Sequence, residues 1–306
     1  MTTAESSEES DEMQRCASCG IAAGDDIKLK KCTACHLVRY CGVKCQRDHR
    51  PQHKRECKKR AAELKDEILF KQPQGTHDGD CPICCLPLSI DLQKATTYTC
   101  CNKRICLGCE RANKMREEER RLQYRCPFCR EPVPSTVEEN IKQLMTRTGA
   151  NDPGAMCRVG MMRCQEGDYK SAFEYWTKAA SLGGVEAHYQ LSVTYRLGLF
   201  VAKDEKKEIQ HLTVAAIAGH PLARHNLGTS EWRNGRKERA VKHWIIGAKL
   251  GYDPSMECVK KGHQDGFVSK EDFDAAHRGH EAAIAATKSP QREAAAGDLG
   301  WRCRAY

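Results

Sequence analysis

The sequence has few of the features that mark an exported or membrane-bound protein. Its 306 residues open with MTTAESSEESDEMQ, which has neither the basic start nor the apolar stretch of a secretory signal. The longest purely apolar runs, such as Val214 to Ala218, are far too short to span a bilayer. We therefore expect a soluble protein of the cytoplasm or nucleus, with no membrane as a partner.

Aromatic residues and familiar catalytic motifs are also scarce. Aromatic residues make up 6% of the chain and hydrophobic residues 40%, whereas 30% is charged. This composition is thin for one large core and favours several small modules. No Gly-rich phosphate loop, no Ser/His/Asp order and no carboxylate pair stands out. These absences argue against a self-contained catalytic centre.

Cysteine, by contrast, is abundant. The chain has 20 cysteines, and four of them fall within CCNKRICLGC at residues 100–109. Two explanations compete for such a cluster, a set of disulfides or a metal site. In a reducing compartment, closely paired cysteines are more often metal ligands than disulfides, so zinc is the working hypothesis.

The first group of eight candidate ligands lies between residues 16 and 57. Two cysteine pairs have a two-residue gap, which lets two thiolates of one tight turn reach the same ion. Two later pairs have a three-residue gap, which places both ligands on one face of a helical turn. The order, including RYCGVKCQRDHRPQHKREC, resembles the MYND zinc finger. The interleaved pairing of that family implies one zinc at Cys16, Cys19, Cys41 and Cys45 and another at Cys32, Cys35, His53 and Cys57.

MYND fingers usually dock short proline-containing peptides, so the resemblance implies such a partner. Gln46 and Thr33 stand where groove-lining polar residues are expected, but Arg50 stands where the family commonly has a tryptophan. Arginine offers only its aliphatic stem in place of a flat apolar face, so peptide docking stays open. His36 and His49 fall outside the ligand pattern, and we expect them to face solvent.

A second group of eight candidate ligands, all of them cysteines, lies between residues 81 and 129, after the helix-breaking stretch PQGTHDGD. Their order, with CPIC and CPFCR as outer pairs, resembles a RING finger in an all-cysteine form. The cross-brace of that family implies one zinc at Cys81, Cys84, Cys106 and Cys109 and a second at Cys100, Cys101, Cys126 and Cys129.

The adjacent pair in this second group poses a geometric problem. Neighbouring side chains on an extended chain point to opposite sides, so Cys100 and Cys101 can share an ion only if the backbone kinks. Asn102, which follows them, is a residue type that tolerates such turns. The alternative is that either Cys100 or Cys101 is a spare thiol. Cys85 is also spare by count, and we expect it to be buried as a small apolar residue.

About four zincs per chain, each held by four protein ligands, would be structural and would leave no open position for metal hydrolysis. The RING resemblance implies instead a ubiquitin ligase that holds a ubiquitin-conjugating enzyme and forms no covalent bond itself. By position, Ile83 and Pro127 would contact that enzyme, and Arg130 would bridge it to ubiquitin. Residues 110–125 are strongly charged and lack the aromatic that many active RING fingers present there, so whether the ligase is active stays open.

The C-terminal half begins with EPVPSTVEENIKQLMTR, where Ser135 and Glu138 predict a capping box at the start of a helix. The chain then repeats itself. Ala155, Ala187, Ala223 and Ser255 recur at spacings of 32, 36 and 32, and Gly183, Gly219 and Gly251 at 36 and 32. This pattern predicts two helices per unit, with small residues where they cross and a glycine ending the second. It resembles the Sel-one-like repeat, a relative of the tetratricopeptide repeat.

We therefore predict a mainly α protein in which two small zinc-stabilised modules, MYND and RING-like, precede an α-solenoid. The predicted segments are an acidic disordered tail (1–14), a MYND finger (15–57), a linker helix (58–76), a RING-type finger (77–131), a lead-in helix (132–150), Sel-one-like repeats (151–283) and a tail (284–306).

Three functions compete. The first is a ubiquitin ligase whose repeats and MYND finger recruit a protein target, and the second is a scaffold that only binds proteins. The third is a nucleic-acid partner, because the net charge of +9 includes five acids in the first twelve residues and leaves +14 for the remainder. Since KLKK, KRECKKR and RNGRKER lack interleaved aromatics, a solvated basic surface is favoured over nucleic-acid binding.

Overall fold

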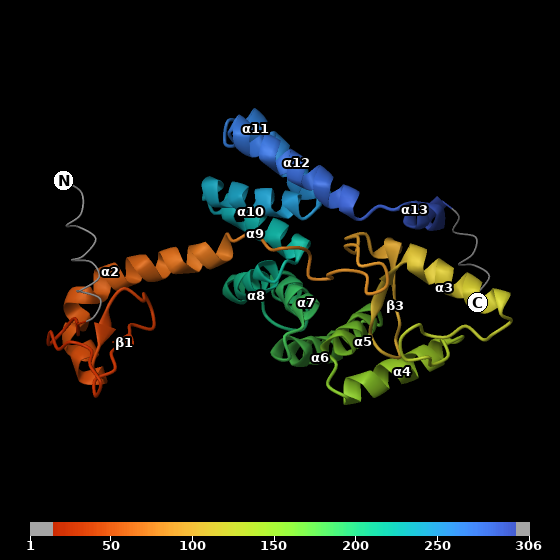
Figure 1. The fold of residues 1–306 in the computed structure, drawn as a ribbon, viewed down its shortest axis with the longest axis horizontal. Coiled ribbons are helices and arrows are strands. Elements are labelled where there is room, and N and C mark those ends of the chain that lie inside the picture. The colour runs from red at the N-terminus through yellow and green to blue at the C-terminus, as the bar shows by residue number, and fades with distance from the viewer. Residues whose placement is uncertain (1–14, 298–306) are drawn as a thin grey trace. The chain divides into compact units, whose positions relative to one another are not determined.

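The computed structural model describes residues 15–297, and the chain divides into two compact units after Lys71 (Figure 1). The predicted acidic tail at 1–14 and the end of the predicted C-terminal tail, with Cys303, lie outside the described residues. Each unit is described separately below.

The first unit is a small module that runs into one long helix. Strands β1 (Lys30–Lys31) and β2 (Arg39–Tyr40) pair antiparallel, and helix α2 (Val43–Leu69) follows them. The buried core of the module consists of Cys16, Cys32, Cys35 and Tyr40. So small an apolar core cannot hold the module together without a further source of folding energy.

Helix α2 joins the predicted end of the MYND finger to the predicted linker helix without a break. Pro51 lies inside the helix, where its missing N–H removes one backbone hydrogen bond. The stretch KRECKKRAAELKDEIL that follows contains neither glycine nor proline, so nothing ends the helix before Leu69. The helix predicted from residue 58 is therefore the continuation of one that begins inside the finger.

The second unit opens with a module built around a short hairpin. The 3₁₀ turn η1 (Leu92–Lys94) leads into β3 (Ala95–Thr97), which pairs antiparallel with β4 (Arg104–Cys106), and α3 (Leu107–Glu119) follows. Leu88, Tyr98 and Ile105 form its apolar core together with four of the cysteines. The connection between the two strands carries the adjacent cysteines, which places both at one end of the hairpin.

Helix α4 (Val137–Gly149) begins five residues after the start of the predicted lead-in helix, and its N-cap lies one residue later than predicted. Thr136 is its N-cap and accepts a hydrogen bond from the Glu139 N–H at 3.2 Å, while the Glu139 carboxylate accepts one from the Ser135 N–H at 2.9 Å. The capping box predicted at Ser135 and Glu138 is therefore wrong by one residue. The sequence STVEE offers two hydroxyl residues and two glutamates at the same spacing, so the pattern alone could not choose between them.

Four helix pairs follow and form the predicted solenoid (Figure 1). The pairs are α5 (Pro153–Gln165) with α6 (Tyr169–Ser181), α7 (Val185–Leu197) with α8 (Glu205–Ile217), α9 (Pro221–Arg233) with α10 (Lys237–Lys249), and α11 (Asp253–Gln264) with α12 (Lys270–Ala286). Helices α5 to α11 pack mainly against the helices before and after them in the chain, as expected for a solenoid, whereas α12 packs more on α10 than on α11.

The repeat alignment made from the sequence is confirmed by burial and backbone conformation. The four residues aligned in the first helix of each pair are completely buried: Ala155, Ala187, Ala223 and Ser255. The glycines aligned after the second helix adopt a left-handed conformation, with φ of 84°, 85° and 87° at Gly183, Gly219 and Gly251. Small side chains let the helices cross closely, and glycine turns the chain into the next pair without steric penalty.

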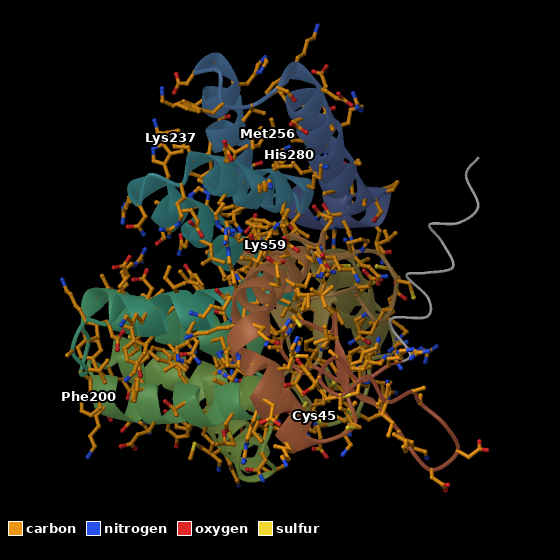
Figure 2. All side chains as sticks on the ribbon, turned by 90° about the vertical axis from the view of Figure 1, so that its left-hand side faces the viewer. Cys45, Lys59, Phe200, Lys237, Met256 and His280 are labelled. Atoms are coloured by element: carbon orange, nitrogen blue, oxygen red, sulfur yellow. The ribbon has the colours of Figure 1, made fainter. Side chains whose placement is uncertain are left out.

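The longer second repeat and the last described helix complete the fold. Helix α7 ends at Gly198, and the turn that leads to α8 exposes Phe200 at the edge of the solenoid (Figure 2). The tail predicted from residue 284 is not observed as such over residues 284–297. Helix α12 extends to Ala286, and α13 (Pro290–Gly297) packs against α3 of the cysteine-rich module (Figure 1).

Candidate metal centres

One type of backbone turn presents the thiols. After four of the C-x-x-C pairs, the next residue has a positive φ and donates its N–H to the carbonyl of the first cysteine at 2.8–3.1 Å; these residues are Gly20, His36, Cys85 and Arg130. Asn102, with a φ of 56°, makes the corresponding bond to the Tyr98 carbonyl at 2.8 Å. Such a turn curls the backbone around one point, so both thiols of a pair reach the same position.

The first cluster in the first unit is formed by Cys16, Cys19, Cys41 and Cys45, whose sulfur atoms all lie within 4.8 Å of one another. The Cys19 and Cys41 sulfurs are 3.7 Å apart, and the Cys41 and Cys45 sulfurs 3.5 Å. Cys45 lies in the first turn of α2, so the cluster ties the N-terminal turn of the module to the helix. These are the four residues that the MYND pattern groups together.

The second cluster of this unit is formed by Cys32, Cys35, His53 and Cys57. The Cys32 and Cys57 sulfurs are 3.8 Å apart, and the Cys35 sulfur lies 3.2 Å from Nε2 of His53. His53 and Cys57 are one turn apart on α2, so the two interleaved clusters clamp the helix to the strands.

His49 has a role that the sequence did not show. Its ring stacks on that of His53 at 5.7 Å, and its Nδ1 lies 3.1 Å from the Tyr40 hydroxyl. The expectation that His49 faces solvent is therefore wrong, whereas His36 is exposed as expected. His49 packs against a candidate ligand and restricts the orientation of its ring.

The cysteine-rich module of the second unit contains two further clusters. One consists of Cys81, Cys84, Cys106 and Cys109, and the other of Cys100, Cys101, Cys126 and Cys129. In the first, the Cys84 and Cys106 sulfurs are 3.8 Å apart, and the Cys106 N–H donates to the Cys81 sulfur at 3.5 Å. Each cluster combines alternate pairs along the chain, which is the cross-braced order.

Both adjacent cysteines belong to the second of these clusters. The Cys101 and Cys126 sulfurs are 3.6 Å apart, and the Cys100 and Cys129 sulfurs 3.3 Å. The turn that ends at Asn102 supplies the kink that two neighbouring thiols need in order to face one ion. The alternative, in which one of the pair is a spare thiol elsewhere on the surface, does not describe this geometry.

The donor sets and their separations fit zinc. A tetrahedral site with zinc–sulfur bonds of about 2.3 Å places its sulfurs about 3.8 Å apart, close to the 3.3–3.8 Å recorded between these thiols. A disulfide would require about 2.05 Å, and the nineteen cysteines within residues 15–297 are free. The four clusters thus correspond to about four structural zinc sites, each with four protein donors and no place for a reactive water.

The ionisation of the thiols also calls for a cation. Burial acts to raise the pKa of Cys16, but N–H groups of Cys19, Cys41 and Ser18 lower the pKa to about 6 overall. Hydrogen bonds with the neighbouring thiols of Cys45 and Cys16 instead raise the pKa of Cys41 to about 12. Four thiols this close cannot all ionise beside one another, whereas a divalent cation stabilises all four thiolates at once.

The three predicted partner-binding residues lie on the loops that hold the clusters of the second unit. Ile83 is 45% exposed, Pro127 is half-buried, and the Arg130 side chain is 58% exposed. The Arg130 guanidinium lies 3.9 Å from the carboxylate of Glu117, which is itself only 2% exposed on α3. The two side chains proposed to meet a conjugating enzyme and ubiquitin, Ile83 and Arg130, are thus accessible.

The predicted peptide-docking residues of the first unit differ in their exposure to solvent. Thr33 and Arg50 are exposed, and Gln46 is half-buried. Three large apolar side chains of the same module are also exposed, Ile21, Leu37 and Val43, by 41%, 47% and 63%. Apolar surface on so small a module is a feature of protein-binding sites. The three residues, of which Val43 begins α2, follow no periodicity that could have revealed them.

Cys85 corrects a further expectation. It is exposed rather than buried, because it occupies the left-handed position that closes the Cys81–Cys84 turn. A residue at the end of such a turn points away from the ion, so Cys85 is neither a ligand nor a core residue.

A fifth group of candidate donors, His77, Glu186 and His220, was not predicted. His220 Nδ1 accepts the Ala223 N–H at 3.2 Å, and its Nε2 lies 3.0 Å from the Glu186 carboxylate. A neutral ring whose Nδ1 accepts carries its proton on Nε2, so Nε2 donates to Glu186 and has no lone pair for a metal. The His77 ring stacks on that of His220 at 4.4 Å. This group therefore joins the segment before the zinc module to the solenoid and is not a metal site.

Within residues 15–297, the structure contains no helix that combines the length and the apolar character needed to cross a bilayer.

Comparison with known proteins identifies the first of these modules. Residues 9–57 match the MYND finger family model. An uncharacterized protein of Neisseria meningitidis serogroup B is 29% identical over 130 residues, which are 40% of this chain and 26% of that protein. The chain therefore spans only about a quarter of the length of this curated relative.

Two solved structures resemble parts of the chain. A Sel1 repeat protein from Oxalobacter formigenes is 27% identical over 50% of this chain and 66% of its own, with a TM-score of 0.43. A protective antigen of uropathogenic Escherichia coli strains, which displays an SLR fold, is 21% identical over 53% of this chain and 36% of its own, with a TM-score of 0.40. The solenoid assignment rests on the helix pairs and their aligned buried residues, and the zinc assignment on the clusters. The chain thus contains a MYND finger at its N-terminal end and a helical-repeat solenoid in its C-terminal half.

Proposed function

We propose that the chain is a zinc-dependent protein-interaction scaffold that acts as a RING-type ubiquitin ligase. In this proposal the solenoid and the MYND finger bind a protein target, and the cysteine-rich module binds a ubiquitin-conjugating enzyme. One observation carries it: the two cross-braced clusters hold Ile83 and Arg130, and both side chains are exposed. The scaffold part rests on the MYND finger and the solenoid.

The chemistry assigned to the chain is binding and orientation. Zinc, held by Cys81, Cys84, Cys106 and Cys109 and by the second quartet, supplies folding energy and fixes the two loops. Ile83 offers an apolar contact to the conjugating enzyme, and the Arg130 guanidinium can donate several hydrogen bonds to carbonyls of the enzyme and ubiquitin at once. Holding a thioester beside a lysine of the bound target accelerates the transfer by proximity.

Autoubiquitination with purified full-length protein, activating enzyme, ubiquitin and a panel of conjugating enzymes tests this proposal. Transfer should fall at least tenfold with Ile83→Ala or Arg130→Ala, while the zinc count by native mass spectrometry stays at about four. Leu122→Ala is a matched control, because Leu122 is a 53% exposed apolar residue of the same module. No transfer with any enzyme of the panel, from protein that holds about four zincs, would refute the ligase.

Two observations favour the second candidate, a scaffold without enzymatic activity. Residues 110–125 contain only one aromatic, Tyr124. Its hydroxyl is hydrogen-bonded to that of Tyr98 at 2.7 Å and so is not offered to a partner. Arg130 also faces the buried Glu117 carboxylate, which competes with any partner for its guanidinium. A scaffold would still capture a protein target in pull-downs, and this capture would depend on zinc.

The proposal extends to the MYND finger and to the cellular location. A proline-containing peptide would contact exposed apolar side chains of the finger such as Leu37, and Leu37→Asp should abolish its binding in fluorescence anisotropy. We also propose that the protein acts in the cytoplasm or nucleus, where its thiols stay reduced. Fractionation of cells that express a tagged chain would show this directly.

A further inference from the structure

The last described helix is built into the zinc module, although the residues in contact lie more than 180 positions apart in the chain. From α13, the Arg292 guanidinium donates to the Pro87 carbonyl at 2.6 Å, to the Leu86 carbonyl at 2.9 Å and to the Cys84 sulfur at 3.2 Å. These three acceptors lie together on the loop of the Cys81–Cys84 turn. One planar group from the C-terminal end thus holds both the backbone of this loop and a ligand thiol.

The rest of α13 fits the start of α3 closely. The Gln291 side chain donates to the Gly108 carbonyl at 3.1 Å, and the Arg111 side chain donates to the Ala294 carbonyl at 2.8 Å. Ala295 is completely buried. A Cβ atom at Gly108 would lie 3.1 Å from the backbone of Gln291 and Arg292, so the absence of a side chain there permits the approach. Such complementary contacts indicate a defined docking site rather than a loose end of the chain.

The chemistry of a four-thiolate site explains what a guanidinium adds. Zinc with four thiolates carries a net charge of −2, and donors around the sulfurs spread this charge and orient the ligands. A guanidinium keeps its charge at any physiological pH and presents its donors in a fixed plane, so it can serve two carbonyls and one sulfur together. Lysine could supply the charge but not this geometry.

We propose that Arg292 is a positioning residue of the Cys81, Cys84, Cys106 and Cys109 zinc site, and that α13 is a clamp that retains zinc there. The inference rests on the zinc assignment and not on ligase activity. It distinguishes this site from the other cluster of the same module, whose Cys100, Cys101, Cys126 and Cys129 lie on different loops. Loss of such an outer donor changes metal affinity by about 10–100-fold in comparable sites.

Site-resolved thiol alkylation tests the proposal with the full-length, zinc-loaded protein. N-ethylmaleimide is added with a zinc chelator, and peptide mass spectrometry follows each cysteine over time. In Arg292→Ala, the four cysteines of the clamped site should react at least tenfold faster than in the unchanged protein. The cysteines of the other cluster serve as an internal control and should keep their rates. Arg278→Ala, an exposed arginine on α12, should leave all rates unchanged.

A second pair of variants separates the thiolate contact from the docking of the helix. Arg292→Lys restores the charge, and its rates should fall between those of Arg292→Ala and the unchanged protein. Gly108→Val should displace α13 and give fast alkylation even though Arg292 is present, together with faster hydrogen exchange in residues 290–297. Equal alkylation rates at Cys84 in Arg292→Ala and the unchanged protein would overturn the proposal, as would faster reaction of both clusters to the same extent. Ubiquitin transfer takes no part in either readout.

Discussion

Replacement of Gly228 by alanine should destabilise the solenoid, although alanine is the better helix former. Gly228 lies inside α9, where a Cβ atom would be 2.5 Å from Nε1 of the Trp244 indole on α10. Trp244 is 6% exposed and rigid, so it cannot move aside without disturbing the packing around it. Gly160 faces Trp176 in the same way in the first repeat, at 2.6 Å, so two of the repeats share this contact.

Two opposing effects set the magnitude. Alanine in place of glycine inside a helix stabilises it by about 0.5–1 kcal/mol, while overpacking of a filled core is destabilising by about 1–3 kcal/mol. The clash dominates because no real Cβ contact is as short as the one required here. We expect a net loss of about 0.5–2 kcal/mol in the local free energy of opening. Gly149→Ala on α4 is the control, because nothing lies near its added Cβ and it should be neutral or stabilising.

The second repeat shows how the clash could be relieved. At the positions equivalent to Gly228 and Trp244 it has Ser192 and Leu212, both almost completely buried. Gly228→Ala should therefore be far less harmful in a Trp244→Leu background. Native-state hydrogen exchange of the α9 and α10 amides measures the local free energy of opening in each background. It does not assume that a solenoid unfolds in one step. If Gly228→Ala destabilises equally in both backgrounds, the steric argument is wrong.

Four further predictions concern the metal sites and the helix ends. Chelation of zinc should unfold residues 15–57, since each structural zinc supplies about 10–16 kcal/mol; circular dichroism should show that most solenoid helicity remains. His53→Ala should lower the zinc count by one in native mass spectrometry, whereas His53→Cys should keep it. Thr136→Ala should lower the stability of α4 by about 1 kcal/mol, measurable by hydrogen exchange, because an N-cap is lost. Burial alone would raise the pKa of Glu186, but hydrogen bonds from His220 and His77 hold it well below its usual range. The ionised Glu186 carboxylate thus stabilises the fold above about pH 4.3, and this stabilisation is lost in acid. The difference in Tm between the unchanged protein and Glu186→Gln should therefore shrink as the pH falls.

Features that depend on neighbours in the chain could be predicted from the sequence. The C-x-x-C gaps fix which thiols share a turn, and the left-handed residues after them follow from the same local geometry. The buried Ala155 and its equivalents could be aligned because each repeat solves the same packing problem with the same small side chain. Asn102 could be identified as a turn residue from its tolerance of positive φ.

Features that depend on distant contacts could not be predicted. His49 lies one helical turn before His53 on α2, but its contact with the Tyr40 hydroxyl depends on how strand β2 meets the helix. Arg292 stands in a stretch with the composition of a tail, and only the folded chain brings it to Cys84. The N-cap of α4, Thr136, was missed for a different reason, because STVEE offers two capping patterns at the same spacing.

The contacts of the second cysteine-rich cluster bear on how the solenoid and the zinc module act together. Asn102, which closes the turn of this cluster, donates to the Asp152 carboxylate at 2.8 Å, and Asp152 caps the first repeat helix. The Thr99 hydroxyl lies 2.9 Å and 2.7 Å from the side chains of Asn140 and Gln143 on α4. With α13 on the other side of the module, the repeats are joined to both clusters within one compact unit. A target bound to the solenoid would therefore be held at a set distance from Ile83 and Arg130, which is the condition for proximity to accelerate transfer.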